Sequence, residues 1–375
     1  MRLNMRRIPC VYMRGGTSKA VIFHEKDLPV DKSKWDSIFL KVMGSPDVKQ
    51  IDGMGGTVSS TSKIAIIKKS ERPHADVDYT FCQVDIDIAN VDYRANCGNI
   101  SSAVGPFAID EGLVEIHEPI TVVKVFNTNT GKYIEEHVRV SDGRAEVYGD
   151  TSIQGVPGTG SAIDMFFMNP GGATTGELLP TGNASDTVYL PDGKAIRVSI
   201  VDCSNAVVFI NASDLGMYGT ELTEVNSNKG LLQKIEYIRG QAAVACRLVE
   251  SVEKAATEST SVPKVAIISK SQTYTDMDGK KVDRENMDIC VRAISVGKLH
   301  KAYPMTVAVC TGAAAHIKGS IVHELFDDNV PQKINLGHAS GVTPVFIDYD
   351  GTNVIRGGVV RTARRIMDGF VYIKE

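Results

Sequence analysis

Short stretches in which apolar residues fill every second position, or every position, recur along the 375-residue chain. Such stretches, rich in β-branched and aromatic residues and bounded by glycine and polar residues, are typical of β-strands. They include "CVYM", "VIFH", "IAII", "VDYTFCQVDID" and "KVAIISK". Asp-Gly pairs favour tight turns between strands. The pattern predicts a chain built mostly of strands, with hairpin turns at Asp142–Gly143, Asp192–Gly193, Asp278–Gly279 and Asp350–Gly351.

Helical periodicity is rarer. After the "NCGN" segment, five apolar residues at i, i+3, i+4, i+7 and i+8 predict a helix of about three turns with one apolar face. They are Ile100, Ala103, Val104, Phe107 and Ala108. Pro106 lies within this helix and is expected to kink it. Three more helices are predicted: one following "CTGAAAHI" with Ala314, Ile317, Ile321 and Leu325 on one stripe, one near Leu231–Val249, and one over Glu285–His300.

The two halves of the chain resemble each other. Each is mostly strands and contains an apolar helix introduced by a cysteine–glycine–small-residue turn, "NCGNISSAVGPFAI" in the first half and "VCTGAAAHIKGSIV" in the second. The length also suggests two domains of under about 200 residues each. We therefore expect two related α+β domains, each with a buried helix. The segment "NPGGATTGELLPTGNASD" is the expected hinge, giving domains of residues 1–183 and 184–366, with the C-terminal strand 367–375 joined to the first.

Composition and charge exclude several classes of protein. The net charge of −4 gives no bulk attraction to nucleic acid or to an anionic membrane. No apolar run reaches the roughly 20 residues of a membrane span, and the N-terminus lacks the apolar stretch of a signal peptide. The seven cysteines form no CxxC pair, which favours reduced thiols in a cytoplasm. The eight histidines show no HExxH motif, so the sequence predicts no metal site.

Two segments, "RGGTSK" at 14–19 and "GGTVSSTSK" at 55–63, share a glycine pair and a lysine. A phosphate loop places its lysine beside a glycine at the start of a helix, and neither copy does so. The alternative is a plain turn made by glycine and hydroxyl residues. Lys63 differs from Lys19 in the longer run of hydroxyl residues before it, and a strand-like apolar run follows it directly. A partly buried lysine has its charged form disfavoured, so Lys63 is a candidate proton carrier.

Cys97 stands at the expected start of the first helix. A helix N-terminus stabilises a thiolate, and free backbone N–H groups there can hold a carboxylate. A buried cysteine followed by an asparagine cap is an equally good interpretation of these residues alone. Five further segments suit anionic ligands: "RGGTSK", "PTGN", "CTGAAA", "GHASG" and "RTARR". Each alone is more typical of a turn or a solvated charge cluster, but together they suggest a site for small carboxylates.

The combination of "YMRGGTSKA", "GSPDVKQIDGMGGTVSSTSK", "NCGN", "PTGN", "GKLHKAY", "GHASG" and "RTARRIMDG" resembles the family of methylitaconate and methylaconitate isomerases, which also includes oxalomesaconate tautomerases. The resemblance covers essentially the whole chain in the same order. It implies a diaminopimelate-epimerase-like fold: two similar α+β domains, each a mostly antiparallel sheet around a central helix, with the active site in the cleft between them.

The resemblance also implies an activity and its residues. The reaction is an allylic 1,3-proton shift in an unsaturated di- or tricarboxylate, without metal, nucleotide or redox cofactor. Lys63 corresponds to the favoured catalytic acid/base, and Cys97 is the second catalytic candidate. In related epimerases two cysteines face each other, but "VCTGAAA" puts Val309 rather than Cys310 at the second position, which disfavours a two-thiol mechanism. The substrate-binding candidates are Arg14, Gly16, Thr17, Ser18, Asn96, Gly98, Asn99, Thr311, Gly312, His338, Ser340 and Gly341.

Two other functions remain as alternatives: an amino-acid epimerase on the same fold, and a non-catalytic carboxylate-binding helper of an aconitase-like dehydratase. Among isomerase substrates, "NTNTGK", "GNISSAVGPFAIDEG" and "RTARRIMDGFVYI" resemble the methylitaconate branch most. The sequence leaves the oligomeric state open, and a homodimer is compatible with it. No nucleic-acid or membrane partner is expected.

Overall fold

The computed structural model describes residues 5–93, 97–259, 262–295, 297–301, 303–326 and 329–374. They form two compact units: Phe167–Val359 make up unit 2, and the rest of the described chain makes up unit 1. Unit 2 is thus inserted between two parts of unit 1.

The segment expected to be the hinge belongs to unit 2. The boundaries between the units fall at Phe166–Phe167 and Val359–Val360. The boundaries expected from the sequence were 183–184 and 366–367. The buried carboxylate of Asp202 accepts hydrogen bonds from the backbone N–H groups of Thr174 and Thr175, at 2.7 and 2.6 Å. These contacts tie the segment to the sheet of unit 2.

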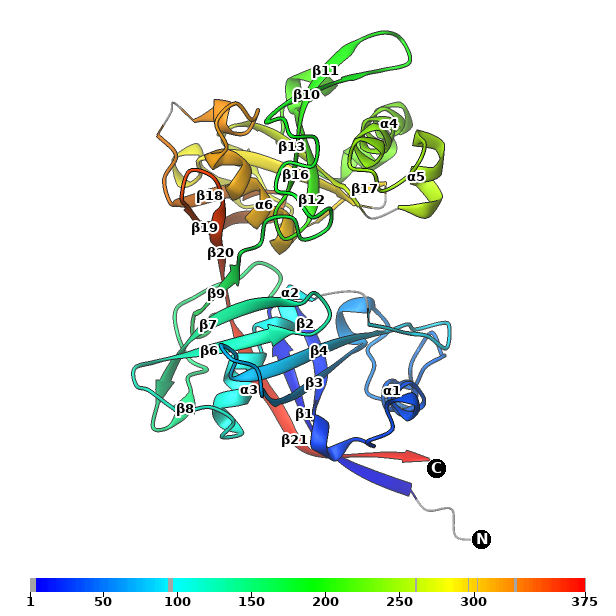
Figure 1. Ribbon diagram of the computed structural model, residues 1–375, viewed down its shortest axis with the longest axis vertical. Helices are drawn as coiled ribbons and strands as arrows, with labels where there is room; N and C mark the ends of the chain where they lie inside the picture. The colour runs from blue at the N-terminus through cyan, green and yellow to red at the C-terminus, as the bar shows by residue number, and fades with distance from the viewer. Residues whose placement is uncertain are drawn as a thin grey trace. The chain divides into compact units, whose positions relative to one another are not determined.

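Unit 1 is a mostly antiparallel sheet around one broken helix. The C-terminal strand pairs along the N-terminal strand, so segments from opposite ends of the chain lie side by side (Figure 1). The strands are β1 (Met5–Gly15), β2 (Ser18–His24), β3 (Lys63–Lys69), β4 (Val77–Val84), β5 (Val91–Asp92), β6 (Ile120–Asn127), β7 (Lys132–Ser141), β8 (Arg144–Ala145), β9 (Ile163–Met168, which continues into unit 2) and β21 (Ala363–Lys374).

Helix α1 (Trp35–Met43) joins β2 to the parallel strand β3 and covers one face of the sheet. Its apolar side chains pack with Ile64 and Ile66 of β3 in one core. Because successive strand residues point to opposite faces, Lys63, Ala65 and Ile67 face the other way. Both faces of β3 are therefore covered, which explains the unbroken apolar run "IAII". The sequence analysis did not predict α1.

The first predicted helix is confirmed as the central helix of unit 1, in two pieces. α2 (Gly98–Ser101) and α3 (Val104–Asp110) are separated at Ser102–Ala103. The break lies four residues before Pro106, where the proline ring excludes the carbonyl of Ser102 from the helix. The five residues of the predicted apolar face are all fully buried. This burial fixes the position of the Cys97 end of the helix against the sheet.

Unit 2 has the strands β10 (Asp186–Tyr189), β11 (Ala195–Asp202), β12 (Ala206–Asn211), β13 (Lys264–Lys270), β14 (Tyr274–Thr275), β15 (Lys281–Val282), β16 (Ile289–Ser295), β17 (Lys298–Leu299), β18 (Lys333–His338), β19 (Gly341–Tyr349) and β20 (Val354–Arg361, which continues into unit 1). Its helices are α4 (Lys229–Ala245), α5 (Val252–Glu258) and α6 (Met305–His316).

The two units share one topology. Five consecutive ladders run antiparallel, parallel, antiparallel, parallel and antiparallel: β1–β2–β3–β4–β6–β7 in unit 1 and β11–β12–β13–β16–β18–β19 in unit 2. In each unit a helix follows the second of these strands, α1 or α4–α5, and the central helix, α2–α3 or α6, precedes the fifth. The expected pair of related α+β domains, each with a buried helix, is confirmed.

The second predicted helix is wrong in its position. α6 begins at Met305 with Pro304 as its N-cap and ends at His316, so "CTGAAA" lies in its body and not before its start. Its residues are apolar around the whole circumference, as in a helix enclosed on all sides, so no single stripe marked its bounds. Ile317 is already the C-cap, and Leu325 belongs to a separate 3₁₀ turn.

The other helix predictions had opposite outcomes. The helix near Leu231–Val249 is confirmed as α4, with Ile235, Ile238 and Ala242 buried. The helix over Glu285–His300 is wrong, because this segment forms strands β16 and β17. The four Asp-Gly pairs lie between consecutive strands as predicted, and each of their glycines has a positive φ.

Candidate active site

Lys63 is the first residue of β3, and only 7% of it is exposed. Its Nζ donates a hydrogen bond to Oε1 of Gln83, the residue directly opposite on β4, at 2.5 Å. Nζ also lies 4.9 Å from the centre of the Phe81 ring. Burial lowers the pKa of Lys63, while the charge and hydrogen bonding of Cys97 act in the opposite direction. Burial thus makes the uncharged, proton-accepting form of Lys63 more accessible than in an exposed lysine.

Cys97 is the N-cap of α2, and it is partly exposed while the other six cysteines are buried. Its predicted place at a helix start is confirmed. Its backbone carbonyl accepts from the amide and the hydroxyl of Ser101, at 2.9 and 3.1 Å. These bonds fix the first turn of the helix, and the thiol lies within interaction distance of Lys63, where it opposes the effect of burial on the lysine pKa. The structure therefore brings the two catalytic candidates together.

The tip of the β1–β2 hairpin packs on the start of α2. A Cβ on Gly15 would lie 2.5 Å from the carbonyl oxygen of Asn99, and one on Gly16 would lie 2.2 Å from its Oδ1. Gly16 also has a φ of +51°, which side chains disfavour. Asn99 Nδ2 donates to Oγ1 of the exposed Thr17 at 3.0 Å. The predicted binding residues Gly16, Thr17 and Asn99 thus form one cluster, with Gly98 next to it as the first residue of α2.

Arg14 fastens this hairpin to the chain that precedes β21. Its Nη1 donates to the carbonyl oxygens of Gly16 and Thr362, at 3.0 and 2.8 Å, and to Oγ1 of Thr362 at 3.0 Å. Burial, together with the charge of Arg364, lowers the pKa of Arg14. Ser18 is buried at the base of the turn, opposite Gly15. Arg14 and Ser18 therefore support the hairpin, and their predicted contact with a substrate stays a prediction. Asn96 lies outside the described residues.

The loop of "GSPDVKQIDGMGGTVSSTSK" is closed by the buried side chain of Gln50. Its Nε2 donates to Oγ of Ser45 and of Ser62, at 3.0 and 2.7 Å, and its Oε1 accepts from the backbone N–H of Thr57 at 3.0 Å. A Cβ on Gly55 would clash with the Gln50 amide at 2.2 Å. The glycines and hydroxyls thus build a turn before a strand, as the alternative to a phosphate loop expected.

In unit 2, Thr311 and Gly312 lie inside α6. Thr311 is fully buried; its Oγ1 donates to the carbonyl of Val307 and lies 2.7 Å from the Tyr303 hydroxyl. A Cβ on Gly312 would lie 2.7 Å from Ile347 of β19. The predicted helix start at "CTGAAA" is wrong, so the backbone N–H groups of this segment lie in the helix body and are not free to bind an anion. Val309 and Cys310 are likewise buried in α6, and the residue at its start is Pro304.

The "GHASG" residues form the turn between β18 and β19. The buried His338 stacks on Tyr303, with ring centroids 6.3 Å apart, and its Nε2 lies 2.8 Å from Oγ1 of Thr343. The Tyr274 hydroxyl donates to the carbonyls of His338 and Gly341, and Oγ of Ser340 donates to the carbonyl of Lys301. Tyr303 thus connects Thr311 to His338. Tyr303 was not among the residues predicted from the sequence.

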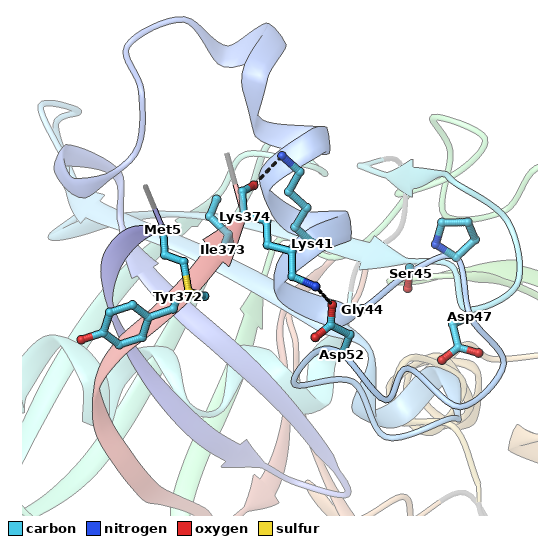
Figure 2. Close-up of a pocket in the computed structure, with 10 residues that line it drawn as sticks. Met5, Lys41, Gly44, Ser45, Asp47, Asp52, Tyr372, Ile373 and Lys374 are labelled. Atoms are coloured by element: carbon cyan, nitrogen blue, oxygen red, sulfur yellow. Dashed lines mark hydrogen bonds and ion pairs between the residues drawn. The ribbon is translucent and has the colours of Figure 1, made fainter. Parts of the chain in front are cut away.

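A separate pocket in unit 1, of about 310 Å³, lies by the ends of β1 and β21 (Figure 2). Its charged side chains already have partners: Lys374 pairs with Asp52 at 2.7 Å, and Lys41 donates to the carbonyl of Lys374 at 2.8 Å. None of the predicted site residues lines it. In the described ranges, no cluster of His, Cys, Asp and Glu has the arrangement of a metal site. None of the helices described is long and apolar enough to cross a membrane.

Comparison with known proteins adds the family. Residues 5–374 match the model of the PrpF protein family. The chain is 45% identical to 3-methylitaconate isomerase of Eubacterium barkeri, over 98% of both chains. It is 38% identical to 2-methyl-aconitate isomerase of Shewanella oneidensis, over 98% of this chain and 97% of that one. It is 39% identical to 4-oxalomesaconate tautomerase of Pseudomonas putida, over 99% of this chain and 97% of that one.

Solved structures agree. A crystal structure of methylitaconate-delta-isomerase superposes with a TM-score of 0.94 at 45% identity, covering 99% of this chain and 96% of that one. A hydroxyproline epimerase from Agrobacterium vitis shares the fold, with a TM-score of 0.53 at 10% identity. The match covers 99% of this chain and 94% of that one. The fold and relatives define an enzyme of the isomerase class on an epimerase-like fold. The chain belongs to the PrpF protein family, which confirms the family expected from the sequence.

Proposed function

We propose that this protein catalyses an allylic 1,3-proton shift in a small unsaturated di- or tricarboxylate, with Lys63 as the acid/base and Cys97 as its partner. The observation that carries the proposal is the contact between the buried Lys63, whose pKa burial lowers, and the partly exposed Cys97 at the start of α2. The names of the relatives, all isomerases or tautomerases of unsaturated carboxylic acids, support it.

The chemistry needs a base and a means of holding charge. Neutral Lys63 takes a proton from the carbon next to the double bond, and the electron pair spreads over the allylic system onto a carboxylate oxygen. The ammonium of Lys63, or the Cys97 thiol, then gives a proton to the other end of the allylic system, and the double bond moves by one position. General acid–base catalysis of this kind contributes about 100- to 10,000-fold.

The start of α2 is the proposed seat of a substrate carboxylate. The first N–H groups of a helix have no partner within it and favour anions. Gly98 and Asn99 supply these groups, and Thr17 adds a hydroxyl beside them. Because Gly16 lacks a side chain, the hairpin tip can lie this close to the helix. The carboxylate would thus lie beside Lys63 and Cys97, where charge develops during the reaction.

Among the substrates of its relatives, a methylitaconate-like acid is the proposed one. The identity to the methylitaconate isomerase, 45%, exceeds the 38% and 39% to the methylaconitate isomerase and the tautomerase. One methylene in a pocket changes affinity by only about 1–3 kcal/mol. We therefore expect measurable but slower turnover of the neighbouring acids.

The test is proton NMR in heavy water with a panel of unsaturated acids, which reports both the isomer formed and the carbon that exchanges. Lys63→Met should lose at least about 100-fold in turnover. Lys69→Met, at the exposed end of the same strand, is the matched control and should stay near the parent rate. Near-normal turnover of Lys63→Met would overturn the assignment. Binding without interconversion in the parent protein would instead indicate a helper protein, and α-proton exchange in amino acids would indicate an epimerase.

A further inference from the structure

The shortest contact described above for Lys63 is its hydrogen bond to the side chain of Gln83. Lys63 and Gln83 are cross-strand partners on the β3–β4 ladder, with their side chains on the same face of the sheet. The bond from Nζ to Oε1, 2.5 Å long, joins an amine to a neutral amide. Two polar side chains interact with Nζ, Cys97 and Gln83, and Gln83 is the one that carries no charge and takes no proton at ordinary pH.

The orientation of the Gln83 amide is fixed by the turn that precedes Lys63. Its Nε2 donates to the carbonyl oxygens of Ser62 and Ser59, at 2.9 and 3.2 Å. Both N–H groups of the amide are therefore used. A flipped amide would place its oxygen against two carbonyl oxygens and its N–H groups against the lysine. Donor and acceptor chemistry thus leaves only one orientation, with Oε1 toward Nζ.

The carbonyl of Ser62 is itself held in place. Oγ of Ser62 donates to the carbonyl of Val84 at 2.8 Å and accepts from the buried Gln50 amide at 2.7 Å. The carbonyl of Ser62 also accepts from the backbone N–H of Val84 at 3.2 Å. The hydroxyl-rich segment "SSTSK" thereby fixes the orientation of the Gln83 amide through its backbone carbonyls. A fixed orientation of this kind preserves the geometry of a site during turnover.

We propose that Gln83 is a positioning residue of the isomerisation, whose fixed amide oxygen holds one N–H of Lys63 and so directs the lone pair of the amine away from β4, toward the substrate. This inference rests on the proposed role of Lys63 as proton carrier. A neutral amine has two N–H groups and one lone pair, and the lone pair cannot face Oε1. A carboxylate at this position would orient the lysine equally well, but its charge would keep the lysine protonated.

The decisive variant is Gln83→Glu, which changes shape little and adds one negative charge. An opposite charge within hydrogen-bond distance raises a lysine pKa by about 1 to 3 units. The uncharged base then becomes scarcer at neutral pH, so activity there should fall by at least about tenfold and return as the pH is raised. The pH profile of kcat/KM should move to higher pH by the same amount. Gln233→Glu, exposed on α4, is the matched control and should leave the profile unchanged.

Gln83→Met removes the acceptor without adding charge. The Lys63 ammonium loses a partner, so its pKa should fall, the profile should move to lower pH, and kcat should fall by about tenfold through lost orientation. The two variants thus predict shifts of opposite sign, which a merely structural role would not produce. If Gln83→Glu does not fold, Gln83→Met alone decides: an unchanged profile with unchanged kcat overturns the proposal.

A direct measurement of the Lys63 pKa separates this proposal from the function on which it rests. The rate of Nζ acetylation by acetic anhydride, followed by mass spectrometry across pH, reports the pKa of the lysine without turnover. Parallel shifts of this pKa and of the kcat/KM profile support the proposal. If neither moves in Gln83→Glu, the positioning role is overturned. If the labelling pKa moves and the activity profile does not, the coupling of Gln83 to Lys63 stands and Lys63 is not the base.

Discussion

The two units have the same architecture but differ at the corresponding ends of their central helices. Strand β3 reads "KIAIIKK" and its counterpart β13 reads "KVAIISK", so each begins with a lysine, Lys63 or Lys264. Burial lowers the pKa of both lysines. The central helix of unit 1 has Cys97 as its N-cap, whereas that of unit 2 has Pro304. The fold thus supplies the desolvated lysine twice, whereas a cysteine at the start of the central helix is found in unit 1.

The largest expected effect tests whether this difference matters for catalysis. Lys264→Met should keep kcat within about tenfold of the parent, whereas Lys63→Met should lose about 100- to 10,000-fold, because proton transfer is assigned to the lysine beside the thiol. Steady-state kinetics of both variants on the same acid, at several pH values, measure the ratio. Equal losses in kcat would mean that the two lysines share the chemistry and that the thiol is not what distinguishes them.

A second difference lies beneath the central helices. In unit 1, Gly105 of α3 lies against the buried Glu136, whose Oε2 accepts from its N–H at 2.9 Å; in unit 2, Gly312 lies against Val345 and Ile347. Burial raises the pKa of Glu136 to about 8, from an ordinary value of 4.5. The carboxyl is therefore protonated in the folded protein under conditions where the unfolded chain has released the proton.

This buried acid should make stability depend on pH. The folded state binds more protons than the unfolded state between the two pKa values, so the stability that this group contributes is fully present below about pH 4.5 and is lost as pH rises through about 8. The loss amounts to on the order of 3 kcal/mol at pH 7. Urea unfolding of Glu136→Gln should show a flatter pH dependence than the parent, and Glu135→Gln, the neighbour on the opposite face of β7, should not. Parallel curves for the parent and Glu136→Gln would contradict the assignment.

The smallest effect concerns the two corresponding hairpin turns. Gly16, at the β1–β2 turn, has a φ of +51°, and Ser204, at the β11–β12 turn, has one of +58°. Gly16→Ser should raise KM by severalfold, because its Cβ would displace the Asn99 side chain, besides costing about 1 kcal/mol of stability through its backbone conformation. Ser204→Gly relieves a similar backbone strain but loses the hydrogen bond, 3.0 Å long, from Oγ to the carbonyl of Thr306. Because the two effects oppose each other, the free energy of unfolding should change by less than about 1 kcal/mol. Kinetics and thermal melts of the two variants measure the contrast, and an unchanged KM in Gly16→Ser would separate the hairpin tip from binding.

The sequence predicted most where a pattern was local. The apolar face from Ile100 to Ala108 marked the central helix of unit 1, and the adjoining motif placed Cys97 at its start. The helix α1 was missed, although Trp35, Ile38, Phe39, Val42 and Met43 have the spacing of an amphipathic helix.

Elsewhere the missing information was tertiary. α6 is enclosed on all sides, so its apolar residues show no stripe from which its start could be placed. Gln83 lies 20 residues from Lys63, and only the β3–β4 register makes them neighbours. A polar residue following Tyr79 and Phe81 at two-residue spacing, on a face that is otherwise buried, was the one sequence signal that could have indicated it. The role of Tyr303 likewise depends on bringing α6 beside the β18–β19 turn.

The pairing of β1 with β21 has a consequence for how the chain is made. A ribosome releases β1 early, but one of the two strands that pair with β1 is β21, so β1 and β21 can meet only after synthesis of the whole of unit 2. Domains generally fold as units during translation, which lets the inserted unit 2 mature first. Until then β1 carries an unpaired edge, a surface prone to pairing with other chains. The sheet of the lysine-bearing unit can thus close only after β21 has left the ribosome.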